Sequence, residues 1–289
     1  MKSVMLILGL VAVGLPQGNA VRIKPSARAI QPGELVLLTI TAPDRMDGLR
    51  ARAFGQDLLP TRVDDRTWHV LVGIDLDVEP GKHDVALRWT QAGKTSTQAA
   101  TTALVVTAKT FRTRNLTVPE TFVNPPESAQ AQIAADAKLI AEAWNSTTEE
   151  RYWKGPFIVP VPHEANSAFG SRSVFNGQAR SPHGGADFAS PTGTPIKAPN
   201  AGRIVIARDM YYTGGTVAID HGVGLVSLVA HLSKIDVKEG AMVQAGEIVG
   251  EVGATGRVTG PHLHWAVKAR GARVDPLSLL AVLGNKSGS

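Results

Sequence analysis

The stretch Gly260-Pro-His-Leu-His-Trp-Ala-Val-Lys268 places two histidines, His262 and His264, at the start of a predicted β-strand. Residues two apart on a strand project from the same face, so both imidazoles can reach one small site. An earlier stretch, Ser181-Pro-His-Gly-Gly-Ala-Asp187, supplies a third imidazole and a carboxylate four residues apart. Either pattern alone is common enough to be incidental, but together they predict a metal or catalytic site.

Short β-prone runs separated by glycine-containing turns surround these two stretches. The runs lie at 202–207, 215–220, 224–229 and 263–268, and the turns contain Gly214-Gly215, Glu239-Gly240 and Thr255-Gly256. Apolar, β-branched runs bounded by glycine are typical of strands joined by tight turns. The second half of the chain is therefore predicted to form a compact antiparallel β-sheet.

The first half of the chain contains a separate set of β-prone runs, at 34–41, 68–75, 83–89 and 101–107. Proline-containing segments then interrupt the pattern, and an Ala-rich stretch from Ser128 to Trp144 has helical spacing, with Ser128 as the expected N-cap. The predicted fold is mainly β. Its expected parts are a signal peptide at 1–20, an immunoglobulin-like β-sandwich at 21–115, a linker and helix at 116–154, and the antiparallel β-sheet domain at 155–284.

The first twenty residues have the features of a secretory signal peptide. Lys2 precedes an apolar run from Val4 to Leu15, and the small residues Gly18 and Ala20 follow. This run is shorter than the roughly 20 apolar residues that span a bilayer. We therefore expect export to the periplasm or the medium, with no stable membrane insertion after the signal peptide is cleaved.

Composition narrows the chemistry that the chain can perform. The 289 residues include no cysteine, so disulfides and thiolate metal ligands are excluded and any metal must be held by histidine and carboxylate. The formal net charge of +5 suits an anionic polymer such as cell wall or nucleic acid. Aromatic residues make up only 5% of the chain and do not alternate with a basic stripe, which argues against nucleic acid.

Five further short stretches, taken in order with the two histidine-containing ones, form a specific pattern. They are Phe169-Gly-Ser-Arg172, Asn176-Gly177, Ile219-Asp-His-Gly222, Ala230-His-Leu-Ser233 and Gly253-Ala-Thr-Gly256. From about Phe157 to Leu280 the chain therefore resembles the M23 family of metallopeptidases, the lysostaphin/LytM-like peptidoglycan endopeptidases. The N-terminal half more weakly resembles the β-rich module that precedes the peptidase in some members.

The resemblance implies one Zn²⁺ per chain, with His183, Asp187 and His264 as its ligands. It also implies that His231 and His262 are catalytic histidines that do not bind the metal. Three protein ligands leave the fourth position of a catalytic zinc open for water. Which of the two histidines acts as the base stays open at this point.

Two further positions are candidate substrate-binding residues, and two depart from the family pattern. Arg172 can donate two hydrogen bonds to a substrate carboxylate, or instead form a salt bridge that stabilises the fold. Asn176 lies in the same matching region. The family often has tyrosine where this chain has Val229, and glutamate where it has Ala266. Neither change removes a ligand or a catalytic histidine.

The expected function is zinc-dependent hydrolysis of peptidoglycan cross-links, most directly the D-Ala–meso-diaminopimelate bond, with Gly-Gly bridges as an alternative target. A non-catalytic M23-like regulator of a cell-wall amidase is the alternative function, although such regulators typically lose metal ligands that this chain keeps. The N-terminal β-domain is expected to act as a spacer or to dock to the wall or to a protein partner; shielding of the active-site cleft is the alternative role.

Overall fold

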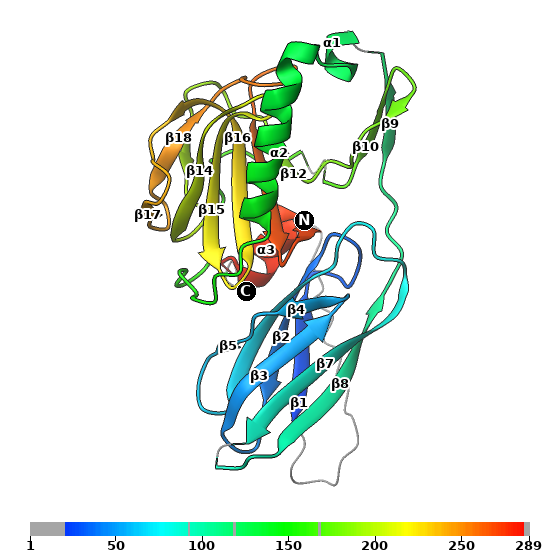
Figure 1. Cartoon of the computed structure of the whole chain (residues 1–289), viewed down its shortest axis with the longest axis vertical. Helices are drawn as coiled ribbons and strands as arrows, with labels where there is room; N and C mark the ends of the chain where they lie inside the picture. The colour runs from blue at the N-terminus through cyan, green and yellow to red at the C-terminus, as the bar shows by residue number, and fades with distance from the viewer. Residues whose placement is uncertain (1–20, 92, 118–119, 167–168, 286–289) are drawn as a thin grey trace. The chain divides into compact units, whose positions relative to one another are not determined.

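The computed structural model describes residues 21–91, 93–117, 120–166 and 169–285, so the predicted signal peptide lies outside the described residues. The chain divides into two compact units, Met1–Lys109 with Ala269–Val274, and Thr110–Lys268 with Asp275–Ser289. Strands dominate both units, which confirms the predicted mainly-β fold class (Figure 1). Among the described residues, no helix has the length and apolar character needed to cross a membrane.

Two four-stranded antiparallel sheets form the first unit, in the strand orders β1-β2-β6-β5 and β4-β3-β7-β8. The core contains Val36 and Leu38 from one sheet and Val85 and Leu87 from the other, all almost fully buried. These two sheets therefore share one hydrophobic core; the immunoglobulin-like connectivity stays a prediction. The strands are β1 (Arg22–Ala27), β2 (Leu35–Thr41), β3 (Met46–Ala53), β4 (Gln56–Leu58), β5 (Thr61–Arg62), β6 (Thr67–Gly73), β7 (Gly81–Gln91) and β8 (Thr97–Val106).

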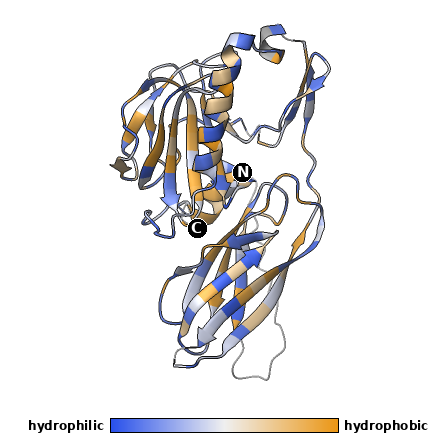
Figure 2. Ribbon diagram, viewed as in Figure 1, coloured by the Kyte–Doolittle hydropathy of each residue, from blue (hydrophilic) through white to orange (hydrophobic). Residues whose placement is uncertain are grey.

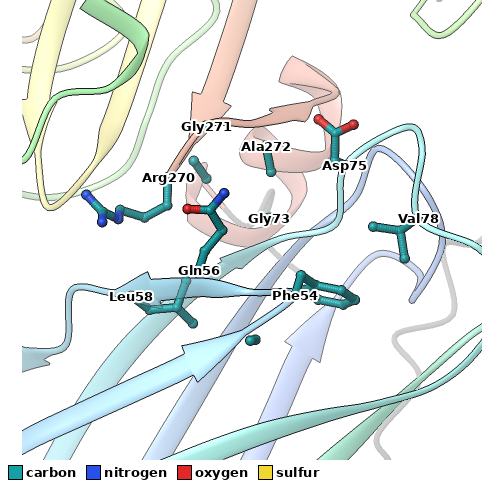
Figure 3. Close-up of a pocket in the computed structure, with 11 residues that line it drawn as sticks. Phe54, Gln56, Leu58, Gly73, Asp75, Val78, Arg270, Gly271 and Ala272 are labelled. Atoms are coloured by element: carbon teal, nitrogen blue, oxygen red, sulfur yellow. The ribbon is translucent and has the colours of Figure 1, made fainter.

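A segment from far along the chain, Ala269–Val274, completes the first unit. The backbone N–H of Arg273 donates to Asp75 at 2.8 Å, and its guanidinium also pairs with Asp75 and with Asp77. A small pocket of about 150 Å³ lies beside this segment (Figure 3). Its lining includes Phe54, Gln56, Leu58, Gly73, Asp75, Val78, Arg270, Gly271 and Ala272.

A nine-stranded sheet forms the main part of the second unit, with the central order β12-β19-β16-β15-β14-β17. The strand β15 pairs with β14 on one side and with β16 on the other, and all of its residues are buried. Figure 2 shows mostly hydrophobic colour along the strands of this sheet. The strands of the second unit in this sheet are β12 (Gly185–Phe188), β13 (Pro195–Lys197), β14 (Gly202–Met210), β15 (Gly214–Gly222), β16 (Leu225–Ile235), β17 (Met242–Val243), β18 (Ile248–Val252) and β19 (Leu263–Ala269). The ninth strand, β20 (Ala272–Val274), lies in the segment that belongs to the first unit.

The helix α2 (Gln130–Trp144) covers one face of this sheet (Figure 1). Its Ile140 and Ala143 pack with Ile206 and Met210 of β14. The helix begins one residue later than predicted: its N-cap is Ala129 instead of Ser128, because Ser128 belongs to a preceding 3₁₀ turn (Glu127–Ala129), and no side chain caps its start. Two short helices, α1 (Glu120–Val123) and α3 (Pro276–Leu283), complete the second unit.

A separate three-stranded sheet also belongs to the second unit. It contains β9 (Thr113–Leu116), β10 (Arg172–Phe175) and β11 (Gln178–Ala179). The strand β9 runs parallel to β10, and β10 forms a hairpin with β11. The unit that carries the large sheet begins at Thr110. The predicted division into a first domain at 21–115, a linker and helix at 116–154 and a second domain at 155–284 stays a prediction.

Candidate metal site

Asp187 and His264 are directly opposite residues on the paired strands β12 and β19. Nδ1 of His264 lies 2.9 Å from Oδ1 of Asp187. His183, which precedes β12, places its Nε2 3.1 Å from the same carboxylate oxygen. One ligand atom from each of the three side chains lies within 4.8 Å of the other two, so the structure brings the three predicted ligands together.

The spacing of these three side chains fits a metal ion. Zinc binds imidazole nitrogen and carboxylate oxygen at about 2.0–2.2 Å, which places neighbouring ligands of a tetrahedron about 3.3 Å apart. The two nitrogen–oxygen separations, 2.9 and 3.1 Å, are close to that value. Two neutral imidazoles and one carboxylate are also a common ligand set of catalytic zinc. The residues present therefore fit Zn²⁺.

A glycine next to the ligands allows the backbone to approach the ring of His264. A Cβ atom built at Gly185 would lie 2.8 Å from Nε2 of His264 and 2.4 Å from the carbonyl oxygen of Trp265. A Cβ atom at Gly184 would meet nothing within 4 Å. Of the two consecutive glycines, only Gly185 is therefore required by the packing of a ligand side chain.

The carboxylate in the ligand set is held in its charged form. Burial would raise the pKa of Asp187, but hydrogen bonds and positive charge from His183 and His264 outweigh it, so the pKa lies well below its usual range. Burial lowers the pKa of His264, and its hydrogen bond to Asp187 opposes that change. An ionised carboxylate and, at His264, an imidazole whose neutral form burial favours are protonation states that metal binding requires.

His231 reaches the site because of an irregularity in β16. Ala230 and His231 together oppose the single residue Thr216 of β15, which makes a β-bulge. The φ angle of His231 is +69°, a left-handed conformation that is uncommon for a residue other than glycine. Its backbone N–H donates to the carbonyl of Thr213 at 2.8 Å. The bulge turns the imidazole out of the strand's regular alternation and toward His262, with ring centroids 4.8 Å apart.

Both non-ligand histidines are anchored in the same tautomer. Nδ1 of His231 lies 3.0 Å from the carbonyl oxygen of Thr255, and Nδ1 of His262 lies 2.9 Å from that of Gly260. A carbonyl can only accept, so each Nδ1 carries the hydrogen and each neutral ring keeps a lone pair on Nε2. Nε2 of His262 lies 3.9 Å from Oδ1 of Asp187. Burial, with the neighbouring His264, lowers the pKa of His231 to about 4.

The two candidate substrate-binding residues lie on the β10–β11 hairpin. Arg172 is exposed, and its backbone N–H donates to the carbonyl of Arg112 at 2.8 Å. Asn176 and Gly177 have φ angles of +48° and +82°, the conformation of a type I′ hairpin turn. The side-chain amide of Asn176 donates to Glu120 at 3.4 Å. The structure therefore gives Asn176 a role in the turn, which explains its residue type independently of substrate.

Two site contacts were not predicted from the sequence, because they involve backbone carbonyls. Thr255 and Gly260 orient His231 and His262 through their carbonyl oxygens. Thr255 also links two strands, since its Oγ1 accepts from the N–H of Gly215 and donates to the carbonyl of Leu232. In the sequence, the match of Gly253-Ala-Thr-Gly256 to the family pattern indicated that this stretch matters. It did not indicate that the carbonyl oxygen of Thr255 orients His231.

The sequence of this chain is similar to those of known peptidases. The model of Peptidase family M23 matches residues 181–276. Over 96 residues the chain is 46% identical to the peptidoglycan DD-endopeptidase ShyA of Vibrio cholerae, and over 97 residues it is 43% identical to the DD-carboxypeptidase/endopeptidase Mpg of Neisseria meningitidis. These matches cover 33% and 34% of this chain but only 22% of either relative.

A solved structure extends the similarity to most of the chain. It is the crystal structure of a peptidase M23 from Pseudomonas aeruginosa, with 33% sequence identity and a TM-score of 0.66. The alignment covers 88% of this chain and 96% of that one, so it includes residues of both units. With the ligand geometry and the family match, this similarity shows that the chain belongs to peptidase family M23.

Proposed function

We propose that this protein is a zinc-dependent endopeptidase that hydrolyses peptide cross-links in bacterial peptidoglycan. The observation that supports this function best is the convergence of His183, Asp187 and His264 beside two anchored histidines that are not ligands. A chain that only regulates an amidase needs neither the complete ligand set nor the paired imidazoles. The retained set therefore favours the enzyme over the regulator.

His183, Asp187 and His264 would hold the metal. When bound, Zn²⁺ supplies a Lewis acid for the scissile carbonyl and lowers the pKa of water to about 7. The ionised Asp187 offsets part of the metal's charge, and the buried surroundings of His264 strengthen electrostatic interactions with the substrate. Three protein ligands leave room for the attacking water and the substrate oxygen.

His231 and His262 provide the proton transfers in this proposal. Each ring presents an Nε2 lone pair, because its Nδ1–H is engaged by a backbone carbonyl. One Nε2 accepts a proton from the attacking water, and the resulting imidazolium returns it to the leaving amine nitrogen. The other ring, when protonated, donates a hydrogen bond to the oxygen that becomes negative in the transition state.

Peptidoglycan is proposed as the substrate on the evidence of the two relatives. ShyA and Mpg are named as peptidoglycan DD-endopeptidase and DD-carboxypeptidase/endopeptidase, and they are 46% and 43% identical to this chain over 96 and 97 residues. The proposed bond is the D-Ala–meso-diaminopimelate cross-link, with Arg172 as a donor to a substrate carboxylate. Action in the periplasm or outside the cell follows, and the first unit is proposed to act as a spacer or docking module.

The test is digestion of isolated sacculi by the purified protein, with and without a chelator, followed by mass spectrometry of the muropeptides. We expect cross-linked dimers to disappear, the loss to stop with chelator, and added zinc to restore it. Asp187→Asn is the matched variant, since it keeps the shape of the side chain but removes the charge. Unchanged muropeptides from folded, zinc-loaded protein would contradict the proposal.

A further inference from the structure

The three proposed ligands are not equally constrained by the fold. Asp187 and His264 lie on neighbouring strands whose ladder sets their separation. His183 lies in residues 181–184, which form no helix or strand. In the part of the chain that the structure describes, its buried Nδ1 has no hydrogen-bond partner. A metal-binding histidine usually donates this N–H to a carboxylate or carbonyl that orients the ring. Here the orientation has to come from backbone position and packing.

Two backbone hydrogen bonds hold His183 in place. The N–H of Gly170 donates to the carbonyl of His183 at 2.8 Å, and the N–H of His183 donates to the carbonyl of Ser171 at 2.9 Å. The ring of His183 packs edge-on against His264, with centroids 4.8 Å apart. The location of the first ligand therefore depends on the backbone at Gly170 and Ser171.

Phe111 in turn packs on Gly170. A Cβ atom built at Gly170 would lie 2.2 Å from two carbons of the Phe111 ring, so the ring occupies the space that any other side chain would need. The φ angle of Gly170 is +76°, which also favours glycine. The residues after Phe111 extend this contact along the hairpin, because Arg172 N–H donates to the carbonyl of Arg112 and Asn176 N–H donates to that of Leu116.

We propose that Phe111 is a positioning residue for the zinc site: by packing on Gly170 it fixes the backbone that holds His183 beside Asp187 and His264. This inference rests on the proposed zinc-dependent function. It makes the Phe111 ring and the backbone of residues 110–116, which follow the first unit directly, part of the support of the metal site. A peptidase fragment that begins at the predicted boundary, residue 155, lacks this support and binds zinc more weakly than the whole protein.

The experiment measures zinc affinity by competition with a chromophoric chelator, in the whole protein and without substrate. Phe111→Ala is expected to lower the affinity roughly tenfold, the lower end of the effect of losing a group that orients a ligand. Phe111→Leu keeps an apolar side chain over Gly170 but loses the ring, so its affinity is expected to lie between that of Phe111→Ala and that of the wild type, and measurably below the latter. Leu116→Ala is the matched control. It also shortens an apolar side chain on the same segment, but the side chain of Leu116 is 44% exposed.

Hydrolysis by Phe111→Ala is expected to recover when zinc is in excess, a recovery that loss of the fold would not show. Wild-type zinc affinity in folded Phe111→Ala overturns the inference. Should that variant fail to fold, Phe111→Leu decides, because an affinity equal to that of Leu116→Ala and the wild type would again overturn it. Absence of zinc binding by the wild-type protein would instead refute the proposed function, and the inference with it.

Discussion

Asp187 and His264 are 77 residues apart in sequence but occupy opposing positions on β12 and β19, with Oδ1 and Nδ1 2.9 Å apart. The register of this ladder decides whether the two side chains can share a metal. A slip of one residue would send one of them to the other face of the sheet, because side chains alternate along a strand. The hydrogen-bonded pairing of β12 with β19 is therefore part of the metal site.

Replacing either non-ligand histidine is expected to separate catalysis from metal binding. His231→Ala and His262→Ala remove a group that transfers a proton or stabilises charge, so kcat should fall by about 100-fold to 10,000-fold. Zinc content, measured by elemental analysis, should stay at one ion per chain because the three ligands remain. His83→Ala, in the first unit, is the control and should leave turnover unchanged. Near-normal turnover in both zinc-loaded variants would contradict the assigned roles.

The two consecutive glycines after His183 are expected to respond differently to a methyl group. Gly185→Ala places a Cβ against the His264 ring and the Trp265 carbonyl, so the free energy of unfolding should fall by about 1–3 kcal/mol. Its zinc affinity should fall too, because the displaced atoms include a ligand ring. Gly184→Ala meets open space and should change stability by no more than about 0.5 kcal/mol. Equal effects in denaturant titrations would show that the close approach at Gly185 is unimportant.

The stability of the first unit is expected to depend on pH through Glu34. This side chain is 2% exposed and accepts hydrogen bonds from Arg28 and Lys109. Burial would raise the pKa of Glu34, but the hydrogen bonds and charges of Arg28 and Lys109 outweigh it and lower the pKa below its ordinary value of 4.5. A lowered pKa in the folded state stabilises the fold fully above about pH 4.5, and this contribution is lost as the pH falls through the folded-state value.

Glu34→Gln tests this dependence, since glutamine keeps the size of the side chain without its charge. Above about pH 4.5 the variant should be less stable than the wild type by about 2 kcal/mol, the contribution of a hydrogen-bonded charged group. The difference should shrink as the pH falls below that value. Urea titrations at several pH values measure it, and a difference that stays constant into the acid range would rule out this role of the Glu34 charge.

The residue types of the site and the strands that carry them could be recognised without coordinates. Histidine and aspartate at these spacings suit zinc, and residues two apart on one strand must share a face, so His262 and His264 were expected at one site. Asn176 was a candidate substrate-binding residue, but its position before Gly177 has a second explanation, a hairpin turn. Asparagine followed by glycine is a strong hairpin signal, and the structure places both residues in that turn.

The remaining features depended on the tertiary structure. Phe111 lies against Gly170, 59 positions away, and the bulge at His231 turns its ring toward His262. No local pattern predicts such contacts, because every residue has a backbone carbonyl and the chain has many rings, and only the folded chain selects which of them meet. The sequence therefore indicates which side chains can bind zinc and transfer protons. The pairing of distant strands decides whether they meet, and the hydrogen-bonded backbone around them decides how they are oriented.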